Sequence, residues 1–244
     1  TIDAAESMDD LMGQMLPAPD SDEGLLPRAD VVIFDEAHKI PEIALNFFGE
    51  ELSTFSIKTV VKELQAVLLA HFQPYAPKDS SWAKECDAVV YAVQDAVLAM
   101  DEAGLAEDTN LNLKDFVDLA KAAEALERAC GALTHLIELC EPFLAASEEI
   151  EKHASTAAGL LPLMNDWVLR LKAPQQAKGS HATPSVFWLE RRKAEVRLIE
   201  TPLSIADKFA RLRSANSDAA WIFTSATIAT DQGNFSHFLG ELGL

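Results

Sequence analysis

Residues 30–38 read Asp-Val-Val-Ile-Phe-Asp-Glu-Ala-His, and residues 219–227 read Ala-Ala-Trp-Ile-Phe-Thr-Ser-Ala-Thr. In each stretch a short apolar run, typical of a strand buried on both faces of a parallel sheet, passes directly into polar residues. Ligands of open α/β sheets bind beyond the carboxyl ends of the strands. The two stretches therefore predict an α/β unit with a ligand site formed by the residues that follow its strands.

The polar residues after the first strand suit magnesium-dependent hydrolysis of a nucleotide. Asp35 is placed to hold Mg²⁺ through its water shell, Glu36 to orient and deprotonate an attacking water, and His38 to sense the γ-phosphate. The second segment could receive that signal through a tight turn that contains Ala226 and through the hydroxyl groups of Thr224, Ser225 and Thr227. A metal hydrolase built on the first segment alone is disfavoured, because one short turn cannot supply three converging ligands.

A helical block separates the two stretches. From about residue 46 to residue 180 the apolar residues recur at helical spacings, which predicts four or five helices. The longest seam runs from Phe116 to Cys140 in alternating steps of three and four, as in a helical bundle. Strand-like alternation returns only in the last 64 residues, around residues 186–199, and Pro202 is expected to open a helix.

The predicted fold class is therefore α/β with a large all-α insertion. Residues 1–45, an acidic connector followed by the first strand, and residues 181–244 are expected to form the α/β part. Residues 46–180 are expected to form the insertion, whose two ends must lie close together in space.

The charge distribution restricts where nucleic acid could bind. A net charge of −19 argues against a strong general binder of phosphates. Residues 46–180 carry 21 acidic and 11 basic residues, whereas residues 181–213 carry seven basic and four acidic ones. Candidate DNA contacts in this basic segment are Trp188, Arg191, Arg192, Lys193 and Arg197. A charged hairpin that simply faces water is favoured over a DNA contact for this segment.

Three cysteines, Cys86, Cys130 and Cys140, lack the C-x-x-C spacing of a zinc or iron–sulfur site and are expected to be buried thiols. No metal site with direct structural ligands is expected. No stretch approaches the length of uninterrupted apolar sequence that crosses a bilayer, so we expect no membrane partner and a cytoplasmic location.

The sequence resembles the DinG/YoaA/XPD group of superfamily 2 DNA helicases, most closely the bacterial YoaA and DinG branch. Three segments carry the resemblance: residues 25–38 with the Asp-Glu-Ala-His box, residues 201–209, and residues 221–228 with Thr-Ser-Ala-Thr. In that group the first box is motif II and Ser-Ala-Thr is motif III. Both lie in a RecA-like first motor domain that is interrupted by a helical Arch domain, and the same order occurs here.

The resemblance implies an ATP-dependent DNA helicase that unwinds DNA 5′ to 3′ in repair or replication, with ATP, Mg²⁺ and single-stranded DNA as its ligands. It also implies that Asp35 and Glu36 serve Mg²⁺ and water, and that residues 225–227 couple hydrolysis to DNA movement. The sequence contains no Gly-Lys-Ser/Thr, no Gln-x-x-Gly-Arg-x-x-Arg and no four-cysteine cluster. We therefore expect an internal fragment that cannot hydrolyse ATP alone, with any 4Fe-4S cluster lying upstream.

Two hypotheses of different classes follow. In the first, the chain is a helicase fragment with inherited ATPase residues. In the second, its acidic helical block is an interaction module that docks a replication or repair protein. Weak binding of single-stranded DNA would favour the first, and a stable protein complex formed without DNA would favour the second.

Overall fold

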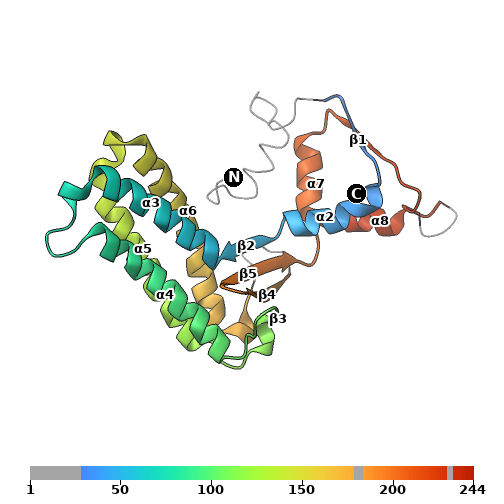
Figure 1. Cartoon of the computed structure of the whole chain (residues 1–244). Coiled ribbons are helices and arrows are strands. Elements are labelled where there is room, and N and C mark those ends of the chain that lie inside the picture. Colours follow the sequence, from blue (N-terminus) through green and yellow to red (C-terminus); the bar gives the residue numbers. More distant parts are fainter. Residues whose placement is uncertain (1–28, 179–183, 230–232) are drawn as a thin grey trace. The chain divides into compact units, whose positions relative to one another are not determined.

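The computed structural model describes residues 29–178, 184–229 and 233–244, which form two compact units (Figure 1). The helical unit comprises residues 50–178 and 187–200. The α/β unit comprises residues 29–49, 184–186 and 201–244. The acidic connector expected over residues 1–28 lies outside the described residues.

Four long helices make up the bundle of the helical unit (Figure 1): α3 (Thr54–His71), α4 (Trp82–Glu102), α5 (Ala120–Cys140) and α6 (Glu148–Lys172). A serine precedes each of three of them and accepts hydrogen bonds from the first turn, as N-cap residues do: Ser53 for α3, Ser81 for α4 and Ser147 for α6. The prediction of a helical bundle is confirmed. Helix α6 runs through Pro162 without a break.

The predicted seam of α5 is buried, but its first part is not helical. Phe116 and Leu119 are buried before the helix begins at Ala120, whose N–H donates to Asp118 Oδ1 at 2.8 Å. This aspartate hydrogen bond favours a turn over another helical turn, which explains the later start. Short 3-10 segments connect the long elements: η2 (Gln73–Tyr75), η3 (Leu113–Asp115), η4 (Glu141–Ala146) and η5 (Pro174–Gln176).

Apolar stripes of all four helices converge on one core, which also contains the three cysteines. Burial raises the pKa of the Cys86 thiol to about 12, and that of Cys130 and of Cys140 to about 11. The prediction of buried thiols is confirmed. One segment, Ala120–Ala146, is long and apolar enough by composition to cross a membrane. In the structure its apolar stripe packs in the bundle core while Glu124, Glu127 and Arg128 are exposed.

A four-stranded sheet belongs to the same unit, so the expectation of an all-α insertion is wrong. Its strand order is β2 (Glu50–Ser53), β5 (Glu195–Pro202), β4 (Ser185–Arg192) and β3 (Asn110–Asn112). Strands β2 and β3 have only four and three residues and contain few apolar ones, so no period-2 pattern marks them. They form because each pairs antiparallel with a strand of the distant β4–β5 hairpin.

The hairpin therefore clusters with the helices, although the sequence grouped it with residues 181–244. Register places Glu50 opposite Glu200, so the first and last residues of the helical unit are neighbours. The sequence placed the end of the insertion at residue 180, which lies outside the described residues, whereas the end of the helical unit in the structure is Glu200. A buried ion pair connects α6 to β5, where Arg170 Nη2 donates to Glu200 Oε2 at 2.7 Å.

The α/β unit contains two parallel strands, β1 (Val31–Phe34) and β6 (Ala220–Phe223), paired residue for residue. Its other elements are η1 (Ala37–Lys39), α2 (Ile40–Phe47), α7 (Ala206–Ala215) and α8 (Ser236–Leu242). Phe34, Trp221 and Phe223 on one face of the strands pack against Phe209 and Phe238 of α7 and α8.

Two expectations for this unit need correction. Among the described residues the strands are covered on one face only, because Ile33 is 65% exposed and Ile222 is 45% exposed on the other. Pro202 ends β5 instead of opening a helix, since β5 continues its pairing with β2 as far as Glu200. Helix α7 begins at Ala206, whose N–H donates to Ser204 Oγ at 3.2 Å.

Candidate functional site

The two sequence motifs meet at the carboxyl ends of β1 and β6. The strands end in register, with Phe34 opposite Phe223. The Thr224 N–H donates to the Phe34 carbonyl and the Ala37 N–H donates to the Thr224 carbonyl, both at 2.9 Å. Segments almost 190 residues apart in sequence are therefore joined by backbone hydrogen bonds. This placement follows from parallel pairing, which brings carboxyl ends to the same sheet edge.

Asp35 is the first residue after β1, and its side chain is held by the other motif. Its Oδ1 accepts a hydrogen bond from the Glu36 N–H at 2.9 Å and another from the Thr224 hydroxyl at 2.9 Å. Thr224 Oγ1 also lies 3.3 Å from the Phe34 carbonyl oxygen. The carboxylate of Asp35 is exposed, so it is accessible to a ligand in solvent.

Glu36 adopts the left-handed helical conformation, with φ 51° and ψ 41°. Residues other than glycine rarely adopt positive φ, and such strain concentrates at functional sites. Here the conformation turns the chain sharply after Asp35, which directs the Glu36 N–H to the Asp35 carboxylate and lets Ala37 enter the core with no exposed surface. The Glu36 side chain is 56% exposed.

His38 connects the two motifs through its side chain. Its Nδ1 lies 2.8 Å from Ser225 Oγ and 3.2 Å from Glu36 Oε2. A carboxylate can only accept a hydrogen bond, so the contact with Glu36 requires a proton on Nδ1 of His38. The Ser225 hydroxyl can accept from a protonated Nδ1 or donate to an unprotonated one. Ser225 Oγ also accepts from the Thr227 N–H at 3.2 Å, while Ala226 adds only an exposed methyl group.

The donor set at the strand ends fits Mg²⁺ that is held together with substrate phosphates. The described residues contain no group of three His, Cys, Asp or Glu side chains that could hold a metal ion. Mg²⁺ in nucleotide sites usually keeps several waters and takes only one or two carboxylates. Asp35 supplies one exposed carboxylate at the strand end, which is sufficient for that mode of binding.

The basic segment proposed from sequence lies on the β4–β5 hairpin, and each of its three arginines contacts a carboxylate. Arg191 binds Asp101 through two hydrogen bonds, Nε to Oδ1 at 2.8 Å and Nη2 to Oδ2 at 3.1 Å. Arg192 Nη2 donates to Glu190 Oε1 at 2.7 Å. Lys193 occupies the turn with φ 43° and is exposed.

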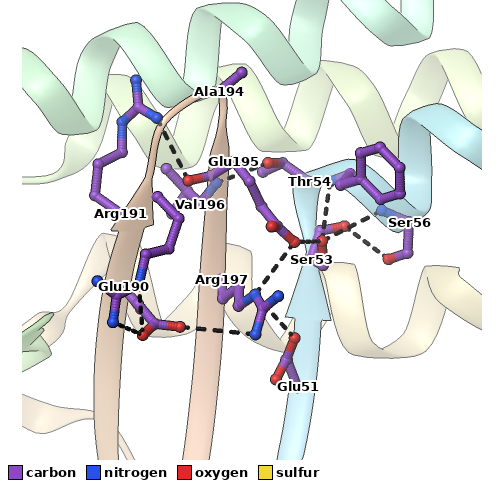
Figure 2. Close-up of polar contacts among 12 residues, drawn as sticks. Glu51, Ser53, Thr54, Ser56, Glu190, Arg191, Ala194, Glu195, Val196 and Arg197 are labelled. Carbon is purple, nitrogen blue, oxygen red and sulfur yellow. Dashed lines mark hydrogen bonds and ion pairs between the residues drawn. The ribbon is translucent and has the colours of Figure 1, made fainter. Parts of the chain in front are cut away.

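Arg197 is the centre of a polar network that joins β2 to the hairpin (Figure 2). Its Nε lies 3.3 Å from Glu195 Oε1 and 3.5 Å from Glu51 Oε1. The Ser53 hydroxyl, which caps α3, also donates to Glu195. Burial opposes the charge of Glu195, but hydrogen bonds from Ser53 and Arg197 lower its pKa, whereas burial raises the pKa of Glu51.

Consequently, the hairpin presents much less unpaired positive charge than its sequence indicated. Trp188 is half-buried and lies opposite Asn112 in the sheet. The acidic partners were missed, although a signal was present. Glu190 with Arg192, and Glu195 with Arg197, are opposite charges two residues apart, which places them on one face of a strand.

Comparison with known proteins agrees with the motifs. No family model matches the chain. The chain is 31% identical over 221 residues to the ATP-dependent DNA helicase YoaA of Escherichia coli (strain K12), and 28% identical over 220 residues to the protein of that name from Haemophilus influenzae (strain ATCC 51907 / DSM 11121 / KW20 / Rd). Each match covers 90% of this chain and 31% of the relative, so the chain spans about a third of those proteins. The resemblance to DinG/YoaA-type DNA helicases is thereby confirmed over nearly the whole chain.

Proposed function

We propose that the chain is the part of an ATP-dependent DNA helicase that carries motif II, a helical Arch domain and motif III. The observation that carries the proposal is the contact of the Asp35 and Thr224 motifs at the carboxyl ends of two parallel strands. The α/β unit is then part of a RecA-like first motor domain, and the helical unit with its sheet is the Arch-like insertion. The similarity to two YoaA helicases supports this assignment.

The uncovered face of the two strands supports the view that this α/β unit is part of a larger domain. Parallel sheets normally have both faces covered, yet Val31, Ile33 and Ile222 are 48%, 65% and 45% exposed. Further strands and helices of a motor domain would bury this apolar surface.

Roles of individual residues follow from their positions. Asp35 binds the water shell of Mg²⁺, which when bound would neutralise charge developing on the nucleotide phosphates. Glu36 orients the attacking water and accepts its proton. His38 contacts both Glu36 and Ser225, so a change at the phosphate side can reach motif III through one imidazole ring. Residues 225–227 transmit that change to the DNA-binding parts of the helicase.

Single-stranded DNA is the proposed substrate of the whole protein, translocated 5′ to 3′ in a cytoplasmic repair or replication process. The 244 residues contain no Gly-Lys-Ser/Thr segment to cradle phosphates, so the chain alone is not expected to hydrolyse ATP. A 4Fe-4S cluster, if the whole protein has one, requires cysteines other than the three buried in the bundle.

An interaction module is the second candidate function, and the hairpin favours it. Its arginines are engaged by carboxylates, so the helical unit offers little free positive charge for phosphates. In that case the acidic bundle docks a replication or repair protein. A stable complex of the isolated chain with such a partner, formed without DNA, is the observation that would favour it.

The test is DNA-stimulated ATP hydrolysis by the full-length protein that contains this chain, prepared without oxygen. We expect Glu36→Gln to lower turnover by at least about 100-fold, since proton transfer contributes on that scale. The matched control is Glu42→Gln on α2, an exposed glutamate outside both motifs, which should leave turnover unchanged. Turnover that survives Glu36→Gln, or no DNA stimulation in the wild type, would contradict the assignment.

A further inference from the structure

The two carboxylate oxygens of Asp35 have different surroundings. Oδ1 accepts two hydrogen bonds at 2.9 Å, from the Glu36 N–H and the Thr224 hydroxyl. Among the residues that the structure describes, no hydrogen bond reaches Oδ2. The protein therefore occupies one oxygen and leaves the other available to a ligand.

Thr224 is well placed to hold this arrangement. Its backbone is fixed on both sides, by the hydrogen bond to the Phe34 carbonyl and by that from the Ala37 N–H. As a β-branched residue it has few side-chain rotamers. Its single hydroxyl proton can go to Asp35 Oδ1 at 2.9 Å or to the Phe34 carbonyl at 3.3 Å. The carboxylate is closer and charged, so it is the stronger acceptor.

We propose that Thr224 is a positioning residue for Mg²⁺ binding: its hydroxyl holds Asp35 so that Oδ2 alone faces the cation. The inference rests on the proposed function. Mg²⁺ tolerates little deviation from octahedral geometry, so a carboxylate that rotates freely would bind its water shell less well. Thr224 then acts on the nucleotide side of the site, in addition to starting the segment that contains motif III.

The test measures Mn²⁺ in place of Mg²⁺, because free Mn²⁺ can be counted by electron paramagnetic resonance. Full-length protein is titrated with Mn²⁺ in the presence of ADP. Thr224→Val keeps the shape and removes the hydroxyl, and we expect it to weaken Mn²⁺ binding about five- to ten-fold, as for a lost exposed hydrogen bond to a charged group. Thr224→Ser restores the hydroxyl and should bind within about two-fold of wild type.

Equal Mn²⁺ affinity in Thr224→Val and wild type, or Thr224→Ser binding as weakly as Thr224→Val, would overturn the inference. Circular dichroism establishes that each variant is folded. If Thr224→Val does not fold, Thr224→Ala must show the same weakening for the inference to stand. Asp35→Asn distinguishes the Mg²⁺ role of Asp35 from the positioning role of Thr224. If Asp35→Asn weakens Mn²⁺ binding and Thr224→Val does not, only the positioning role fails. If Asp35→Asn has no effect either, the proposed Mg²⁺ role of the motif fails as well.

Discussion

Separating Arg170 from Glu200 is the perturbation whose effect on stability can best be worked from the structure. Their side chains are only 5% and 4% exposed, with Nη2 and Oε2 2.7 Å apart. The guanidinium carbon also lies 5.1 Å from the Trp167 ring centre and 4.8 Å from that of Phe187. The pair joins α6 to the last residues of β5, so it connects the bundle to the sheet.

Removing either partner takes this ion-pair contact away from a charge that stays buried. We expect Arg170→Met and Glu200→Leu each to lower the free energy of unfolding by about 3–5 kcal/mol. The double variant buries no charge, so it should lose less than either single variant. The loss in the double variant should therefore be smaller than the sum of the two single losses by at least about 3 kcal/mol.

Urea unfolding of the 244-residue chain, followed by far-ultraviolet circular dichroism, measures the cycle. An exposed pair in the same bundle is the matched control: Arg128 Nη2 lies 2.9 Å from Asp95 Oδ2, but both side chains are more than half exposed, at 57% and 56%. Arg128→Met should cost less than about 1 kcal/mol. Two outcomes would refute the reasoning. In the first, Arg170→Met and Glu200→Leu each lower the free energy of unfolding no more than Arg128→Met does. In the second, the loss in the double variant equals the sum of the two single losses.

Two further predictions concern titratable groups of the helical unit. Burial raises the pKa of Cys86 to about 12 and that of Cys130 and Cys140 to about 11. At about pH 8 the native chain should therefore react with a thiol reagent far more slowly than the urea-unfolded chain. Rapid reaction of any of the three cysteines in the native state would contradict their burial. Glu195 has a lowered pKa in the folded state, so its contribution is present above the unfolded pKa and is lost as the pH falls through the folded one. Glu195→Gln should therefore reduce the free energy of unfolding near neutral pH, with the difference from wild type shrinking on acidification. A difference that is independent of pH would argue against a charged Glu195 that accepts from Ser53 and pairs with Arg197.

The sequence by itself determined the elements whose signals are local. The apolar runs at residues 31–34 and 220–223 are strands, and the 3.6-residue periodicity between them gives the bundle helices, because side-chain burial imposes these periods wherever an element is long enough. The motifs after the strands were also found from sequence. Their meeting could be expected, because parallel strands place their carboxyl ends at one edge.

Only the tertiary structure decided what depends on distant partners. Strands β2 and β3 are too short to carry a pattern and form by pairing with the β4–β5 hairpin, which is why the insertion is not all-α. The hairpin arginines were candidate DNA contacts from sequence, but the sequence does not reveal long-range ion pairs such as that of Arg191 with Asp101. The Thr224 hydrogen bond to Asp35 likewise depends on backbone geometry that no local pattern encodes. Local periodicity reports which face of an element is buried, whereas the partner of each polar group is set by contacts between residues far apart in the chain.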